Sequence, residues 1–220
     1  MPAAVVFDLD GVLIDSEERW NAAREALTRE AGGTWSAGAQ RAMMGMSAPE
    51  WSHYLRDELG VPMSPEEIND DVVARMEAGY RDGLPLLPGA VEAVHALGAR
   101  WPLGLASSAN RPIIALVLEV AGLEACFAAT VSSEEVDRGK PAPDVYLEAA
   151  RQLDVDPRRC VAIEDSTNGL RSAHAAGMAV VAVPNAAFAP DPDALALAGA
   201  VVGTVGEVTP ALVERVAGGR

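Results

Sequence analysis

The sequence predicts an α/β protein, in which a doubly wound parallel sheet carries a small all-helical domain inserted after its first strand. Short apolar runs of strand length alternate with helical segments from residue 84 onward. Several of these runs end in polar or acidic residues. Residues 16–83 lack any clear strand pattern. Alternating strands and helices favour a parallel sheet covered by helices on both faces.

The first predicted strand covers residues 4–10 and ends in two acidic side chains. It holds no charge before Asp8, which is typical of a strand buried inside a parallel sheet. Residues i and i+2 share one face of a strand, so Asp8 and Asp10 are expected to project the same way. Gly11 then lets the backbone turn. Parallel sheets bind ligands at the carboxyl ends of their strands, so both acids are expected at a ligand site.

The segment after this strand is predicted to be helical. Helices are expected over residues 17–29, 48–59 and 65–81. The third has the clearest start, with Ser64 as N-cap, Pro65 in the first turn and Glu67 completing a capping box. We therefore predict a helical cap domain over residues 16–83.

The rest of the chain is predicted to form the core domain, which comprises residues 1–15 and 84–220, with hinges where the chain crosses into and out of the cap. Strands are expected over 102–106, 128–132, 161–164 and 179–183, and helices over 90–97, 112–121, 142–153 and 166–176. The segment 186–220 shows no motif of chemical interest. The four tryptophans, Trp20, Trp35, Trp51 and Trp101, are expected to be packing residues rather than substrate platforms, and Trp20 alone is a candidate exception because it follows the loop of Asp8 and Asp10 into the cap.

Composition narrows the possible partners. The chain has 220 residues with 32 acidic and 17 basic side chains, a net charge of −15. So acidic a surface repels nucleic acid and anionic lipid, and we expect neither as a partner. No stretch has the pattern of a signal peptide or a membrane span, and the two cysteines, Cys126 and Cys160, form no metal-binding or redox spacing. These observations predict a soluble, cytoplasmic, monomeric protein.

The paired acids Asp8 and Asp10 predict a cation site. Two carboxylates at one strand end repel each other unless a cation or a shared proton relieves them. Glu164 and Asp165 also follow an apolar strand, and so reach the same edge of the sheet. Mg²⁺ prefers oxygen ligands and needs only one or two direct carboxylates. The alternative is that the acids only cap the helices that follow.

Four sequence blocks, in this order, resemble the haloacid dehalogenase superfamily, and more narrowly its branch of phosphatases and β-phosphoglucomutase-like enzymes with a helical cap. The blocks are Asp8-Leu9-Asp10-Gly11, Ser107-Ser108-Ala109-Asn110, Gly139-Lys140-Pro141, and Glu164-Asp165-Ser166. The resemblance covers essentially the whole chain and implies a Rossmann-like core.

The resemblance implies a mechanism with an aspartyl-phosphate intermediate. Asp8 would be the nucleophile and Asp10 the general acid and base. Mg²⁺ would be held by Asp8, by the backbone carbonyl of Asp10 and by Asp165, with Glu164 bound directly or through water.

Phosphate would be held by residues of the second and third blocks: Ser107, Ser108, Asn110 and Lys140. A lysine between Gly139 and Pro141 could pair with both Asp8 and the phosphate. Ser107 and Asn110 are also ordinary helix-capping residues, and this alternative remains open.

Two positions in the cap bear on the reaction. Mutase relatives carry a histidine where this chain has Trp20, and an arginine after a Gly-x-Ser loop where this chain has Ala48 after Gly45-Met46-Ser47. We therefore expect a phosphatase acting on a small phosphorylated metabolite such as a sugar or polyol phosphate. The alternatives are a β-phosphoglucomutase-like mutase, with Arg41 or Arg75 gripping a second phosphate, and a phosphate-sensing protein without turnover.

Overall fold

A six-stranded, all-parallel sheet organises the described part of the protein. The structure is a computed structural model, and it describes residues 1–43, 46–185 and 188–219. The strands lie in the order β3-β2-β1-β4-β5-β6. Their bounds are β1 Ala4–Phe7, β2 Leu103–Ser107, β3 Phe127–Ser132, β4 Cys160–Glu164, β5 Ala179–Ala182 and β6 Ala200–Val201. The predicted α/β class with a parallel sheet is confirmed.

Successive side chains of each strand point to opposite faces of the sheet and belong to two hydrophobic clusters, one on each face. Val5 and Phe7 of β1 belong to one cluster, and Ala4 and Val6 belong to the other. The first face packs against α5 (Ala90–Gly98), α6 (Arg111–Ala121) and α10 (Pro210–Gly218). The second packs against α7 (Asp144–Gln152), α8 (Thr167–Ala175) and the short α9 (Pro192–Leu195). Both faces are therefore buried, as the uncharged strand sequences require.

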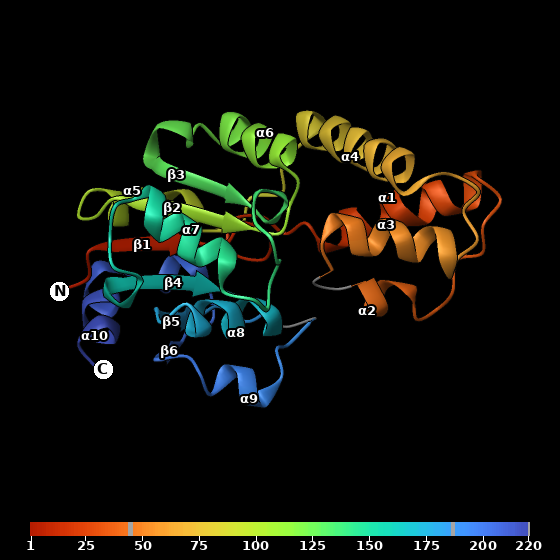
Figure 1. Ribbon diagram of the computed structural model, residues 1–220. Helices are drawn as coiled ribbons and strands as arrows, with labels where there is room; N and C mark the ends of the chain where they lie inside the picture. Colours follow the sequence, from red (N-terminus) through yellow and green to blue (C-terminus); the bar gives the residue numbers. More distant parts are fainter. Residues whose placement is uncertain (44–45, 186–187, 220) are drawn as a thin grey trace.

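The described part of the segment between β1 and α5 is helical. Its helices are α1 (Glu17–Glu30), α2 (Ala39–Met43), α3 (Ala48–Asp57) and α4 (Pro65–Asp82). They gather beyond the carboxyl ends of the strands (Figure 1), where α4 packs against α1, α3 and the core helix α6. They therefore lie at the edge of the sheet where the predicted site residues end.

Local signals placed most elements within one or two residues. The capping box at Ser64 is formed as predicted, because the Ser64 hydroxyl accepts from the N–H of Glu67 and the Glu67 carboxylate accepts from the N–H of Ser64. The sequence did not predict α2, α9, β6 and α10, which carry weak or very short patterns. No helix in the described residues combines the length and apolarity needed to cross a membrane.

Candidate active site

The turn after β1 brings Asp8 and Asp10 to the carboxyl edge of the sheet. Asp8 follows the last residue of β1, and its backbone N–H donates to the carbonyl of Ile163 in the neighbouring β4. Gly11 has a φ of 78°, and a Cβ there would lie 2.0 Å from Oδ2 of Asp165. The turn therefore requires glycine at this position, both for its backbone conformation and because the Asp165 carboxylate rests against it.

A buried lysine joins the two central strands of the site. Lys140 Nζ lies 2.7 Å from Oδ1 of Asp8 and 2.6 Å from Oε1 of Glu164. The hydroxyl of Tyr146 in α7 also donates to Oε1 of Glu164, at 3.0 Å. Burial alone would lower the pKa of Lys140, but the charges of Asp8 and Glu164 outweigh it and raise this pKa. Lys140 is therefore a permanent cation beside Asp8.

Glu164 is fully buried, and both its carboxylate oxygens are already in use. Oε2 accepts from the N–H groups of Asp165 and Ser166 and from the Ser166 hydroxyl. The carboxylate lies against Gly169 of α8, where a Cβ would come within 1.7 Å of Oε1. Glu164 thus fixes Lys140 and the turn after β4, and this arrangement favours Asp165 over Glu164 as a direct metal ligand.

Carboxylate oxygens of Asp8, Glu164 and Asp165 lie within 4.8 Å of one another, close enough to hold one metal ion. Burial, together with the charges of Glu164 and Asp10, raises the pKa of Asp8 to about 8 although Lys140 opposes the shift. Burial and the charges of Glu164 and Asp8 also raise the pKa of Asp165 well above its ordinary value. One lysine does not neutralise this cluster, so its oxygen donors fit a hard divalent cation.

Asp10 is held by two side chains at the start of the helical segment. The hydroxyl of Ser16 and the indole N–H of Trp20 both donate to Oδ1 of Asp10, the latter at 3.2 Å. Ser16 precedes α1 as its N-cap residue, but its hydroxyl points to Asp10 and makes no capping hydrogen bond. Burial raises the pKa of Asp10, and these two hydrogen bonds oppose the shift. A carboxyl group in this environment is suited to proton transfer.

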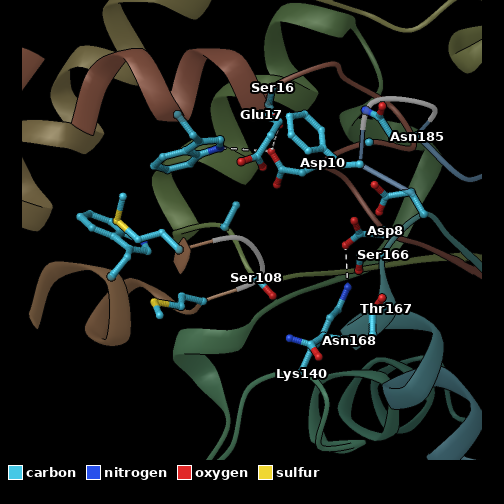
Figure 2. Close-up of a pocket in the computed structure, with 18 of the residues that line it drawn as sticks. Asp8, Asp10, Ser16, Glu17, Ser108, Lys140, Ser166, Thr167, Asn168 and Asn185 are labelled. Atoms are coloured by element: carbon cyan, nitrogen blue, oxygen red, sulfur yellow. Dashed lines mark hydrogen bonds and ion pairs between the residues drawn. The ribbon is translucent and has the colours of Figure 1, made fainter. Parts of the chain in front are cut away.

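A cavity of about 800 Å³ lies over these groups (Figure 2). Asp8, Asp10, Lys140 and Asp165 line it, as do Ser108, Thr167 and Asn168. Residues of α1, α2 and α3 line the other side: Glu17, Trp20, Arg24, Arg41, Met43 and Trp51. A small phosphorylated molecule would therefore contact the sheet edge and the helical segment together.

The two serines predicted to bind phosphate, Ser107 and Ser108, differ in their position relative to the cavity. Ser107 is fully buried and does not line the cavity, since its hydroxyl accepts from the N–H of Ala109 at 3.0 Å. This hydrogen bond belongs to the turn after β2 and is not a helix cap, since Asn110 is the N-cap residue of α6, and contact between Ser107 and phosphate stays a prediction. Ser108 lines the cavity instead (Figure 2). Asn110 also lines it, but its side-chain amide donates to Asn69 and Glu134.

Several cavity residues were not anticipated. Trp51 was expected to pack and Trp20 was the one tryptophan singled out as a possible exception, and both line the cavity. Phe188 and Asp191 also line it, although segment 186–220 shows no motif. Arg24 was missed because a single arginine in a helix resembles any solvated charge.

The two arginines of the helical segment that were considered for a second phosphate differ in their surroundings. Arg41 is exposed and lines the cavity. Arg75 is paired with Glu30 and Asp71, and it does not line the cavity. The loop preceding Ala48 lies partly outside the described residues, because Gly45 is not described.

Comparisons with known proteins agree with this site. The family model for haloacid dehalogenase-like hydrolases matches residues 2–177. Hexitol phosphatase B of Escherichia coli (strain K12) is 36% identical over 187 residues, covering 82% of this chain and 83% of that protein. A bifunctional riboflavin kinase/FMN phosphatase of Arabidopsis thaliana is 32% identical over 187 residues, covering 84% of this chain but only 49% of that protein, so the chain spans about half its length.

A solved structure of CbbY from Rhodobacter sphaeroides in complex with phosphate superposes with a TM-score of 0.86 at 27% identity, covering 97% of this chain and 100% of that one. The family match, the phosphatase relatives and the acidic site at the sheet edge agree on the class of protein. The chain belongs to the haloacid dehalogenase-like hydrolases, as an enzyme of the phosphoric monoester hydrolase class.

Proposed function

We propose that this protein is a Mg²⁺-dependent phosphatase that hydrolyses a small sugar or polyol phosphate through an aspartyl-phosphate on Asp8. The arrangement of Asp8 carries the proposal. Its Oδ1 is held by Lys140, its side chain lines the cavity, and the carboxylate of Asp165 lies beside it. An oriented carboxylate next to a fixed cation is a suitable nucleophile for phosphoryl transfer.

The residues present fit a magnesium site. Asp8 and Asp165 would hold the ion, with the backbone carbonyl of Asp10 as a further oxygen donor and Glu164 adding charge from behind. When bound, the ion supplies positive charge that offsets charge on the transferring phosphoryl group.

Asp8 would attack the phosphorus atom with a carboxylate oxygen, and the bond between phosphorus and the ester oxygen would break. Lys140 orients Asp8 and reduces the repulsion between the carboxylate and the phosphate. Ser108 and the loop that follows β2 would bind phosphate oxygens. The product of this step is an acyl phosphate, and helices above the cavity would limit its exposure to bulk water.

Asp10 would donate its proton to the leaving oxygen, then accept a proton from the water that hydrolyses the acyl phosphate. Its raised pKa favours the protonated form that the first step needs. The hydrogen bonds from Ser16 and Trp20 orient the Asp10 carboxyl group.

The hexitol phosphatase relative supports a polyhydroxylated substrate. Trp20, which donates to Asp10, supports a phosphatase over a phosphomutase, because mutase relatives carry histidine at the position of Trp20.

The test is a measurement of phosphate release from phenyl phosphate and from a panel of sugar and polyol phosphates, with Mg²⁺ and with excess chelator. We expect Mg²⁺-dependent release that Asp8→Asn abolishes while the protein stays folded. Ordinary turnover by Asp8→Asn would disprove the covalent route. Rapid conversion of β-glucose 1-phosphate to glucose 6-phosphate, with little free phosphate, would instead identify a mutase. Absence of turnover on every substrate would indicate a phosphate-sensing protein.

A further inference from the structure

The wall that α1 and α3 contribute to the cavity holds a buried arginine with unused hydrogen-bond donors. Arg24 is 6% exposed. Its Nε and Nη1 atoms are buried and have no hydrogen-bond partner. Its guanidinium carbon lies 5.4 Å from the ring centre of Trp20 and 5.5 Å from that of Trp51. Two aromatic contacts hold the guanidinium group in place without satisfying its N–H groups.

A buried acceptor faces the same cavity from the same helix. Glu17 lies seven residues before Arg24, which is about two helical turns, and both side chains line the cavity. Oε1 of Glu17 is buried without a hydrogen-bond partner. The described residues show no ion pair between Glu17 and Arg24 within 4.0 Å. The wall thus offers donors and an acceptor that do not satisfy each other.

The opposite charges of Arg24 and Glu17 partly balance, although the buried donors of Arg24 and the buried acceptor of Glu17 have no hydrogen-bond partners. Burial lowers the pKa of Arg24 to about 10, and the charges of Glu17 and Asp10 oppose that shift. An unmet hydrogen-bonding group in a buried site is costly, so a ligand that supplies both an acceptor and a donor gains most here. A hydroxyl group does both.

We propose that Arg24, with Glu17, binds hydroxyl groups on the organic part of the substrate, and so selects polyhydroxylated phosphate esters. This inference rests on the proposed phosphatase function. A carboxylate or a second phosphate would satisfy Arg24 but leave Glu17 without a donor and place two negative charges together. An apolar group would satisfy neither.

The position of the pair relative to the reacting group fits this assignment. The ring of Trp20 contacts Arg24 on one side, and its indole N–H donates to Asp10. Asp10 would protonate the ester oxygen, so Trp20 links Arg24 to the residue beside the bond that breaks. Hydroxyls a few carbons away from the phosphate would therefore reach Arg24 and Glu17.

The test compares kcat/KM, measured with Mg²⁺ present, for three substrates: sorbitol 6-phosphate, phosphoglycolate and phenyl phosphate. The variants are Arg24→Met and Glu17→Gln. Arg19→Met is the matched control, because Arg19 lies on the same helix and contacts the ring of Tyr80, but donates to the carbonyl of Gly79 and does not line the cavity.

We expect the ratio of kcat/KM for sorbitol 6-phosphate to that for phenyl phosphate to fall at least thirtyfold in Arg24→Met, mainly through KM. In Glu17→Gln the same ratio should fall at least fivefold. The ratio of kcat/KM for phosphoglycolate to that for phenyl phosphate should stay constant or rise in both variants. Arg19→Met should keep the wild-type ratios. Glu17 is only partly buried, so its variant keeps the test decisive even if Arg24→Met fails to fold.

Two results would overturn the inference while leaving the phosphatase function intact. One is an unchanged sorbitol ratio in both variants. The other is a selective loss of phosphoglycolate hydrolysis in Arg24→Met, which would make Arg24 an anion clamp. If the wild-type protein released no phosphate from any of the three substrates or from the wider panel, the proposed function itself would fail.

Discussion

The ammonium group of Lys140 lies 2.6 Å from the carboxylate of Glu164, at a place where both side chains are almost fully buried. The pair links the loop before α7 to the end of β4. Because Lys140 also bonds to Asp8, one cation is shared by two buried carboxylates. The orientation of the proposed nucleophile therefore depends on an interaction that also stabilises the fold.

Replacing this lysine should damage both stability and activity. In Lys140→Met, two buried carboxylates lose their cation, and breaking a buried ion pair costs about 3–5 kcal/mol. We expect a large fall in melting temperature and a loss of most phosphatase activity at neutral pH. Arg138→Met is the control: Arg138 lies two residues before Lys140, and its loss removes an exposed ion pair with Asp144 and should change stability little. Equal melting temperatures for the two variants would contradict the prediction.

Gly169 should tolerate no side chain. A Cβ at this position would lie 1.7 Å from Oε1 of Glu164, whose carboxylate has no room to move because its hydrogen bonds hold it. We expect Gly169→Ala to lower both the melting temperature and kcat. The control is Gly79→Ala in α4, where the nearest atom would be Nη1 of Arg19 at 3.6 Å.

Alanine favours a helix over glycine by about 1 kcal/mol, so Gly79→Ala should stabilise the protein. Thermal or urea unfolding of both variants checks the opposite signs. A stabilised Gly169→Ala protein would show that Glu164 is not packed against α8.

Stabilisation by Mg²⁺ should grow with pH. In the metal-free protein the pKa of Asp8 is raised to about 8, because burial and neighbouring carboxylates favour its protonated form. A raised folded-state pKa contributes stability that is fully present below the unfolded value of about 3.9 and is lost as pH rises through the folded value. Mg²⁺ offsets this loss by replacing the proton.

We therefore expect Mg²⁺ to increase the melting temperature more at about pH 8 than at about pH 5. Scanning fluorimetry with and without Mg²⁺ measures the difference. Asp165→Asn should reduce the gain at both pH values. A gain of the same size at both, in the unmodified protein, would show that the ion does not displace protons from these carboxyl groups.

The indole N–H of Trp20 should set the acidity of Asp10. Trp20→Phe keeps the ring but removes this donor, which helps to lower the pKa of Asp10. The pKa of Asp10 should rise, and the alkaline limb of the kcat/KM profile should shift to higher pH, with kcat about tenfold lower. Trp35→Phe is the control, because Trp35 belongs to the same helical segment but does not line the cavity. A Trp20→Phe profile identical to that of the control would remove Trp20 from the acid–base step.

The sequence predicted those site residues whose position follows from a strand end. Asp8 and Asp165 follow the neighbouring strands β1 and β4, and the parallel sheet brings them together at one edge. Lys140 lies in the loop before α7 and was predicted from its short sequence motif. The division between Ser107 and Ser108 was not predictable, because it depends on which hydroxyl the local turn uses for its own hydrogen bond. Arg24 was not predictable either, since its burial results from packing between α1 and α3.

Asp10 belongs to the loop after β1, yet both groups that hold its carboxylate belong to the start of the helical segment. A movement of α1 away from the sheet would break these two hydrogen bonds together and free the side chain to rotate. The proton transfer proposed for Asp10 would thus depend on the position of α1. In this arrangement the attack of Asp8 and the departure of the leaving group would be synchronised by closure of the helices over a bound substrate.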